Sequence, residues 1–88
     1  MISAFTLVKI SPPKNVVVYK RMKRLAMVRD VTLVYGEYDL VVKTRTDSLE
    51  ELNAFIYDVL RRIPHITMTT TMIVAKEPPK RKKYQNAT

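Results

Sequence analysis

The residues best suited to binding chemistry fall in two short segments of the sequence. The first is Gly36-Glu37-Tyr38-Asp39, in which a phenol and an acid follow the only glycine of the chain. A glycine is required where the backbone is left-handed or where a ligand approaches the main chain closely. Asp39 can hydrogen-bond its own turn, or its carboxylate can meet an ammonium group beside backbone N–H groups that Gly36 leaves accessible.

The second segment is a threonine-rich run formed by Thr67, Thr69, Thr70 and Thr71. Threonine is common in strands because its side chain is β-branched, which explains the run without any function. Thr69 and Thr71 share one face of a strand, however, and their hydroxyls can donate to a carboxylate or accept from an amine. An acid, hydroxyls and free backbone donors together indicate a receptor for a zwitterion such as an amino acid.

The residue types needed for catalysis, metal binding or a bound cofactor are scarce. The single histidine, His65, follows Pro64 in an expected loop, and the chain has no cysteine that could help it hold a metal ion. The acids Asp47, Glu50 and Glu51 are explained by the capping and the dipole of a helix. One glycine cannot form a phosphate-binding loop. We therefore expect a protein that is not an enzyme and has no catalytic residues, metal site or cofactor.

The length and composition indicate one small domain that needs a second copy of itself. A chain of 88 residues, 47% of them hydrophobic and none of them cysteine, forms one thin core without disulfides. Oligomerisation is the remaining way to stabilise so small a domain. No apolar run is long enough to span a membrane, and the N-terminal segment MISAFTLVKI lacks the features of a secretory signal. We therefore expect a soluble, cytoplasmic protein without a membrane partner.

Half of the excess positive charge lies in the C-terminal segment. The formal net charge is +8, and residues 76–88 carry five basic side chains against one acidic side chain. This segment has two consecutive prolines and no apolar periodicity. We therefore expect a folded domain over residues 1–75 and a basic, disordered tail over residues 76–88. Such a tail can serve solubility alone, or it can bind nucleic acid or anionic lipid.

Hydrophobic periodicity predicts four strands and two helices. We expect strands over residues 2–10, 28–35, 37–44 and 66–75, and helices over residues 14–26 and 47–63. Ser11 is expected to cap the first helix, with proline in its first turn. Asp47 and Glu50 resemble a capping box at the start of the second helix, and Pro64 ends that helix.

The order strand, helix, strand, strand, helix, strand predicts an α+β fold of the ferredoxin-like βαββαβ type. Each helix has one apolar stripe, so we expect both helices on one face of a four-stranded antiparallel sheet. The other face of the sheet then remains open. We expect Val41, Thr69 and Thr71 on this open face, with Asp39 close by at a strand end. An open face that mixes apolar and hydroxyl side chains indicates a subunit interface.

A long segment, VTLVYGEYDLVVKTRTDSLEELNAFIYDVLRRIPHITMTTTMIV, resembles the effector-binding domain of the Lrp/AsnC transcription regulators, also called the RAM domain. The resemblance covers residues 2–75. Its markers are a glycine followed by Tyr-Asp after the second strand, an acid-capped second helix, an Ile-Pro end to that helix, and a Thr-x-Thr motif in the last strand.

This resemblance implies a homodimer in which two sheets pack face to face into an αβ-barrel-like unit, and rings of dimers such as an octamer or a decamer. It also implies small effectors, usually amino acids, bound between subunits. By position, the implied effector-binding residues are Gly36, Tyr38, Asp39, Thr69 and Thr71. We therefore expect an oligomeric module that binds an amino acid or a related metabolite and modulates transcription of amino-acid metabolism indirectly.

The sequence departs from the family pattern at two places. His65 stands where the family commonly has glycine. The chain also begins directly with the first strand, where full-length regulators carry a helix-turn-helix domain, so it resembles the stand-alone members of the family. Because it shows no recognition helix, we expect no sequence-specific DNA binding by this chain alone. Full-length Lrp/AsnC regulators are then its expected partners in transcription.

Two other classes of function remain open from the sequence. One is a basic nucleic-acid-associated protein that acts through the tail and the basic face of the first helix. RNA-binding sheets of this fold stack bases on aromatic side chains, however, and Asp39, Val41 and Lys43 on the third strand offer none. The other is a small dimeric αβ-barrel enzyme, which needs a catalytic histidine or arginine in an enclosed pocket, and His65 is misplaced for that role.

Overall fold

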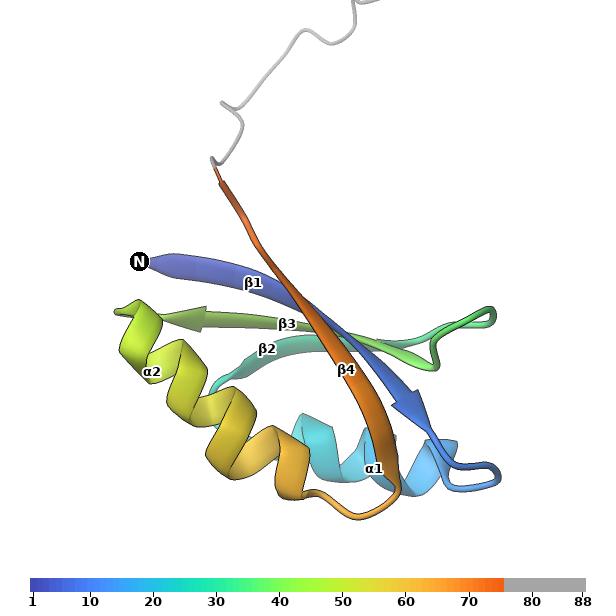
Figure 1. Cartoon of the computed structure of the whole chain (residues 1–88). Coiled ribbons are helices and arrows are strands. Elements are labelled where there is room, and N and C mark those ends of the chain that lie inside the picture. The colour runs from blue at the N-terminus through green and yellow to red at the C-terminus, as the bar shows by residue number, and fades with distance from the viewer. Residues whose placement is uncertain (76–88) are drawn as a thin grey trace, which may run out of the picture.

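The structure, a computed structural model, describes residues 1–75, and the expected tail over residues 76–88 lies outside the described residues. The elements in chain order are β1 (Ile2–Ile10), α1 (Asn15–Lys23), β2 (Val28–Leu33), β3 (Leu40–Thr46), α2 (Leu49–Ala54), the π-helical turn η1 (Phe55–Val59), the 3₁₀ turn η2 (Leu60–Arg62) and β4 (Ile66–Ile73). The four strands form one antiparallel sheet in the order β2-β3-β1-β4. Both helical segments lie on the same face of this sheet (Figure 1). The predicted ferredoxin-like α+β fold is confirmed.

The core lies between the helices and the two central strands. Val8 of β1 pairs with Leu40 of β3, and both side chains are fully buried. Val18 and Met22 bring the apolar stripe of α1 onto this layer, as the spacing predicted. Burying one such side chain contributes about 2 kcal/mol to folding. The candidate site residues lie at the edges of the sheet, and this small core fixes the position of those edges.

The second helical segment begins one residue later than predicted. Ser48 is the N-cap residue, and its hydroxyl accepts a hydrogen bond of 3.1 Å from the backbone N–H of Glu51. The carboxylate of Glu51 accepts in turn from the N–H of Asp47 at 2.8 Å. The predicted pair of Asp47 and Glu50 is therefore wrong by one position, because Leu49 is the first helical residue and Glu51 then occupies the third.

The first helix is shorter than predicted at both ends. It runs from Asn15 to Lys23 rather than over residues 14–26, and its N-cap residue, Lys14, makes no capping bond with its side chain. Ser11 contributes its backbone carbonyl instead, which accepts from the N–H of Lys14 at 3.0 Å. Ser11 therefore closes a turn before the helix and is not the cap that we predicted.

Thr69 and Thr71 lie on the helix side of the sheet, so their predicted place on the open face is wrong. Thr71 pairs with Thr6 on β1, and Thr69 pairs with Val8, and both partners are fully buried beneath the helices. Both alternating sets of β4 side chains mix apolar and hydroxyl groups, so the pairing with β1 decides which set faces the core. Val41 pairs with Leu7 and lies on the open face, as predicted.

Candidate functional site

The β2–β3 hairpin has a backbone that only glycine adopts easily. Gly36 has φ of +132°, and a Cβ atom placed there would meet nothing within 4 Å. The glycine is therefore required by the backbone conformation, which was one of the two readings of the sequence, and not by close packing. The N–H of Val34 donates to the carbonyl of Asp39 at 2.9 Å, which closes the hairpin below this glycine.

Asp39 joins the hairpin to the connection between β1 and α1. Its Oδ2 atom accepts from the backbone N–H of Ile10 at 2.7 Å, and its Oδ1 atom accepts from Nδ2 of Asn15 at 3.1 Å. The carboxylate of Asp39 therefore bonds to these two residues and not to its own turn, which was one of the two interpretations of the sequence. Both donors are neutral groups, so the negative charge of Asp39 is not matched by either of them. Each carboxylate oxygen has two acceptor positions, which leaves room for a further donor.

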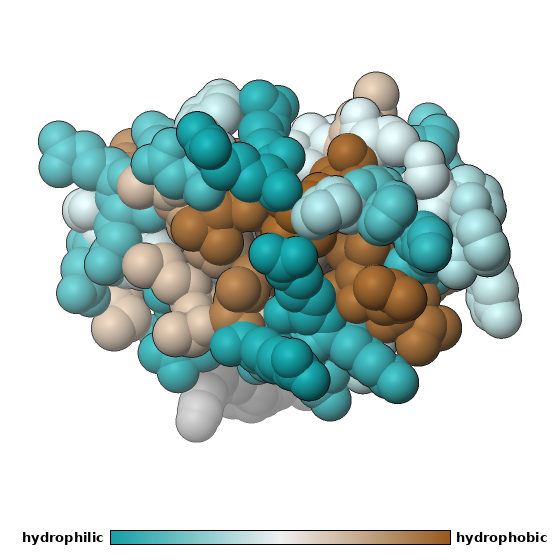
Figure 2. Space-filling view, turned by 90° about the horizontal axis from the view of Figure 1, so that it is seen from below, coloured by the Kyte–Doolittle hydropathy of each residue, from teal (hydrophilic) through white to brown (hydrophobic). Residues whose placement is uncertain are grey.

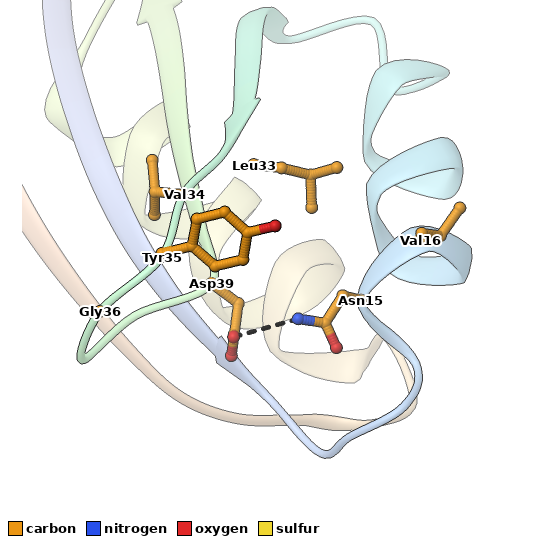
Figure 3. A pocket seen from close by; sticks show the side chains of 7 residues that line it. All are labelled: Asn15, Val16, Leu33, Val34, Tyr35, Gly36 and Asp39. Carbon is orange, nitrogen blue, oxygen red and sulfur yellow. Dashed lines mark hydrogen bonds between the residues drawn. The ribbon is translucent and has the colours of Figure 1, made fainter.

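A hollow of about 460 Å³ lies beside this carboxylate on the helix side of the sheet. We call it the hairpin hollow, and its lining residues are Asn15, Val16, Leu33, Val34, Tyr35, Gly36 and Asp39. The hairpin contributes one wall and the first turn of α1 the other, with the Asn15–Asp39 hydrogen bond at the polar end (Figure 3). Leu33 and Tyr35 remain exposed although both are apolar.

The sequence analysis missed most of this lining. Asn15 and Val16 come from a different element, and nothing in their local pattern distinguishes them from other residues of α1. Leu33 and Tyr35 alternate with the buried Val31, which was the available signal that all three share the helix side of the sheet.

Tyr38 lies at the same hairpin but its hydroxyl is engaged elsewhere. It forms a hydrogen bond of 3.1 Å with the hydroxyl of Thr70 on β4. Thr70 pairs with Leu7 and belongs to the open face of the sheet, so Tyr38 reaches across that face. The side chain of Tyr38 does not line the hairpin hollow.

Thr69 and Thr71 line a second hollow, of about 330 Å³, between β4 and the second helical segment. We call it the β4 hollow, and its lining residues are Leu52, Asn53, Ile56, Tyr57, Arg61, Thr69, Thr71 and Ile73. Because β2 and β4 are the two edge strands, the hollows lie at opposite edges of the sheet. The five predicted residues therefore fall at three places within one chain.

The open face of the sheet mixes apolar side chains with polar and charged ones. Its central rows contain Phe5, Leu7 and Val41, and the edge strand adds Met68 and Met72, which are 53% and 50% exposed. The ammonium group of Lys43 lies 5.6 Å from the ring centre of Phe5. Exposed apolar side chains that are interspersed with polar ones are typical of an interaction surface.

The helix side combines apolar and basic surface. Figure 2 views this side, where hydrophilic side chains separate several apolar patches. Val16 and Val17 of α1 are 52% and 58% exposed, next to the exposed basic side chains Lys20, Arg21, Lys23 and Arg24. Within residues 1–75, no helix is long and apolar enough to cross a membrane, and no group of three or more potential ligands could hold a metal ion.

The family model of the Lrp/AsnC ligand-binding domain matches residues 3–84. The chain belongs to this family. The HTH-type transcriptional regulator FL11 of Pyrococcus abyssi is 41% identical to this Lrp/AsnC domain over 73 residues, which cover 83% of the chain and 48% of the regulator. The chain thus spans about half the length of the curated relatives it matches. These relatives are named as transcriptional regulators.

Solved structures also resemble this Lrp/AsnC domain. The hypothetical protein PHS023 from Pyrococcus horikoshii is 40% identical, with a TM-score of 0.81 over 88% of this chain and 93% of that chain. The transcriptional regulator NMB0573 from Neisseria meningitidis, solved as a complex with L-Met, is 18% identical, with a TM-score of 0.78 over 90% of this chain and 53% of that chain. The second likeness shows the shared fold alone.

Proposed function

We propose that this Lrp/AsnC domain is an oligomeric effector-binding module without catalytic activity. It binds a small amino acid or a related metabolite near a subunit interface and thereby modulates transcription indirectly. The observation that carries the proposal is the carboxylate of Asp39, which is held by neutral donors in a hollow that also has apolar lining side chains.

The hairpin hollow suits an amino acid with an apolar side chain. The ammonium group of the ligand would bind Asp39, whose unmatched charge and free acceptor positions favour a cation. Val16, Leu33 and Tyr35 would contact the apolar part of the ligand. The regulator from Neisseria meningitidis that shares this fold was solved as a complex with L-Met, which is an amino acid of this class.

A second copy of the chain is needed to complete the predicted site. Tyr38 faces the open side of the sheet, and Thr69 and Thr71 lie at the edge opposite the hairpin hollow. In an αβ-barrel-like homodimer, the open faces of two sheets would cover each other, and their apolar side chains would be buried. A ring of dimers, an octamer or a decamer, would bring the hairpin of one subunit to the β4 edge of another. Full-length Lrp/AsnC regulators could join the assembly through the same surfaces.

A ligand would shift the assembly between two ring states only if its affinity for the two states differs. An amino acid that binds better in one ring state stabilises that state, and an effector with equal affinity for both states changes nothing. The number of subunits is therefore the expected output of the domain.

The test combines thermal unfolding and light scattering of the full chain with each standard amino acid at millimolar concentration. We expect at least one apolar amino acid to raise the melting temperature or to change the mass of the assembly. Asp39→Asn should abolish the response, because it removes the charge that binds the ammonium group. Asp47→Asn, which changes an exposed acid outside the hollow, is the matched control and should respond as the wild type does. The absence of any response in the wild type would contradict the proposal.

The nucleic-acid alternative from the sequence receives no support from the comparisons. The matching family model describes a ligand-binding domain, and the basic tail on which the alternative depends lies outside the described residues. The basic residues of α1 are exposed, as that alternative requires, but exposed lysine and arginine side chains are common on any soluble face.

A further inference from the structure

The exposed side of α1 carries a hollow of about 570 Å³, apart from the two hollows described above. We call it the α1 groove, and its lining residues are Val17, Lys20, Arg21, Arg24 and Leu25. Val17 and Arg21 lie four residues apart, and so do Lys20 and Arg24, so two rows of side chains run along the helix. The α1 groove therefore combines three positive charges with apolar side chains.

A narrower hollow of about 120 Å³ adjoins the α1 groove, because Val17 and Arg21 line both. We call it the extension of the groove, and its other lining residues are Val18, Ile63, Pro64 and His65. The end of the second helical segment and the turn into β4 pass beside α1 here (Figure 1). Val18 and Ile63 are 1% and 4% exposed, so the floor of the extension belongs to the core. The carbonyl of His65 accepts from the N–H of Ser11 at 2.9 Å, which fixes the turn.

The charge around the α1 groove has one sign. Residues 14–29 contain six basic side chains and no acidic one. Among the residues that the structure describes, no acidic side chain lines the groove or its extension. The helix dipole accounts for basic side chains in the last turn of α1, but it does not account for Val17, which is 58% exposed beside them. Exposed apolar surface with a polar rim is typical of an interaction site.

We propose that the α1 groove docks an acidic peptide segment of a partner protein. The carboxylates of the segment bind the three basic side chains, and one aliphatic side chain enters the extension. Arg21 lies at the centre because it lines both hollows, and its fork of N–H donors fits a carboxylate. Arginine is common among the central residues that dominate the affinity of an interface. This surface goes beyond the proposed function, because it uses neither Asp39 nor the β4 hollow.

The apolar floor favours a peptide over a nucleic acid or a lipid surface. Proteins that bind single-stranded nucleic acid stack the bases on aromatic side chains. Within residues 1–75, no phenylalanine, tyrosine or tryptophan lines the groove or its extension. A helix that lies on a membrane inserts a continuous apolar face into the lipid. In the extension the apolar surface of Ile63 is recessed instead, so a single peptide side chain can reach it.

The experiment is fluorescence anisotropy of a fluorescein-labelled peptide, Asp-Glu-Leu-Asp-Glu-Leu-Asp-Glu, titrated with the full chain. The salt concentration is about 0.15 M, at which exposed charges more than about 8 Å apart are largely screened. We expect saturable binding that Arg21→Gln weakens by about tenfold, since hydrogen bonds between charged groups are among the strong ones. A peptide with serine in place of both leucines has the same charge and should bind about tenfold more weakly, because it leaves the extension empty.

Two matched pairs of variants separate the groove from general attraction. Lys20→Gln and Lys23→Gln remove the same charge from the same helix, but only Lys20 lines the groove, so only Lys20→Gln should weaken binding, by about threefold. Val17→Ser and Val16→Ser both change a valine that is more than half exposed, and only Val17→Ser should weaken binding of the leucine peptide. The basic residues 76–88 are present in every variant, so their attraction cancels in these comparisons.

Several results would overturn this assignment. No saturable binding by the wild type would exclude the site, and equal losses in Lys20→Gln and Lys23→Gln would show attraction by net charge alone. Equal affinity for the leucine and serine peptides would show that the extension takes no side chain. Tighter binding of a single-stranded oligonucleotide of the same charge, or of phosphatidylserine vesicles, would assign the groove to that partner. A lower mass of the assembly in Arg21→Gln would make the groove a contact between copies of this chain.

Discussion

The two hollows at the edges of the sheet hold their charged groups in different ways. In the hairpin hollow, Asp39 accepts a short bond of 2.7 Å from the backbone of Ile10 and a second bond from Asn15. In the β4 hollow, Arg61 has a long bond of 3.4 Å to Thr69 and a stacking contact with Tyr57. Asp39 therefore links separate elements of the fold, whereas Arg61 is an exposed side chain that contacts the surface of the fold. Changes at Asp39 should therefore lower stability and amino-acid binding together, and changes at Arg61 should leave stability nearly unchanged.

The largest effect on stability is expected for Asp39→Ala. The substitution leaves the N–H of Ile10 without its acceptor and frees Asn15, so the free energy of unfolding should fall by about 2 kcal/mol. Asp39→Asn keeps an acceptor oxygen and should lose less. The measurement is urea unfolding at one fixed protein concentration, because assembly makes stability depend on concentration. A loss in Asp39→Ala no larger than that of the control Asp47→Ala would remove the distinction between the two hollows.

A smaller effect separates two buried threonines of the central strands, Thr6 on β1 and Thr44 on β3. Thr6 and Thr44 are both fully buried, but Thr6 shares a hydrogen bond with Thr71 and the hydroxyl of Thr44 has no partner among the described residues. Thr6→Val should therefore lower the free energy of unfolding by about 1 kcal/mol. Thr44→Val should raise it by about 1 kcal/mol, because valine has nearly the same shape and needs no partner.

The sign of these two changes is the informative result. The same urea titrations measure both variants, and each serves as the control for the other, since the substitution and the burial are matched. If both variants lose stability equally, the hydroxyl of Thr44 has a partner after all, and the contrast between the two threonines is wrong.

The fold could be predicted from the sequence because its signals are local. Leu40 and Val42 alternate with Val41 and Lys43, so the apolar set of β3 identified the face that meets the helices, and the structure agrees. On β4, one alternating set contains isoleucine, methionine and threonine and the other contains threonine and isoleucine, so neither set identified the core face. The pairing of β4 with β1 settles it, and that pairing joins residues 65 positions apart in the case of Thr6 and Thr71.

The candidate sites were harder to predict from the sequence, because the contacts that form them join residues far apart in the chain. Gly36 was identified because a single glycine at a hairpin is a local signal, and its φ of +132° accounts for it. The partners of Asp39 were not, because Ile10 lies 29 positions and Asn15 lies 24 positions away in the sequence. Arg61 lies near the end of the predicted helix over residues 47–63, where nothing in the local sequence distinguishes it from Arg62, and only the packing of that helix against β4 places it beside Thr69.

The smallest effect is expected for Arg61→Gln, and it tests the other half of the comparison. Arg61 is exposed and its hydrogen bond is long, so the free energy of unfolding should change by less than about 0.5 kcal/mol. The urea titration used for Asp39→Ala measures it, with Arg62→Gln as the matched exposed arginine. A loss close to that of Asp39→Ala would make Arg61 a structural residue that fixes β4 to the second helical segment. An unchanged stability would instead show that β4 is held to the second helical segment without help from Arg61.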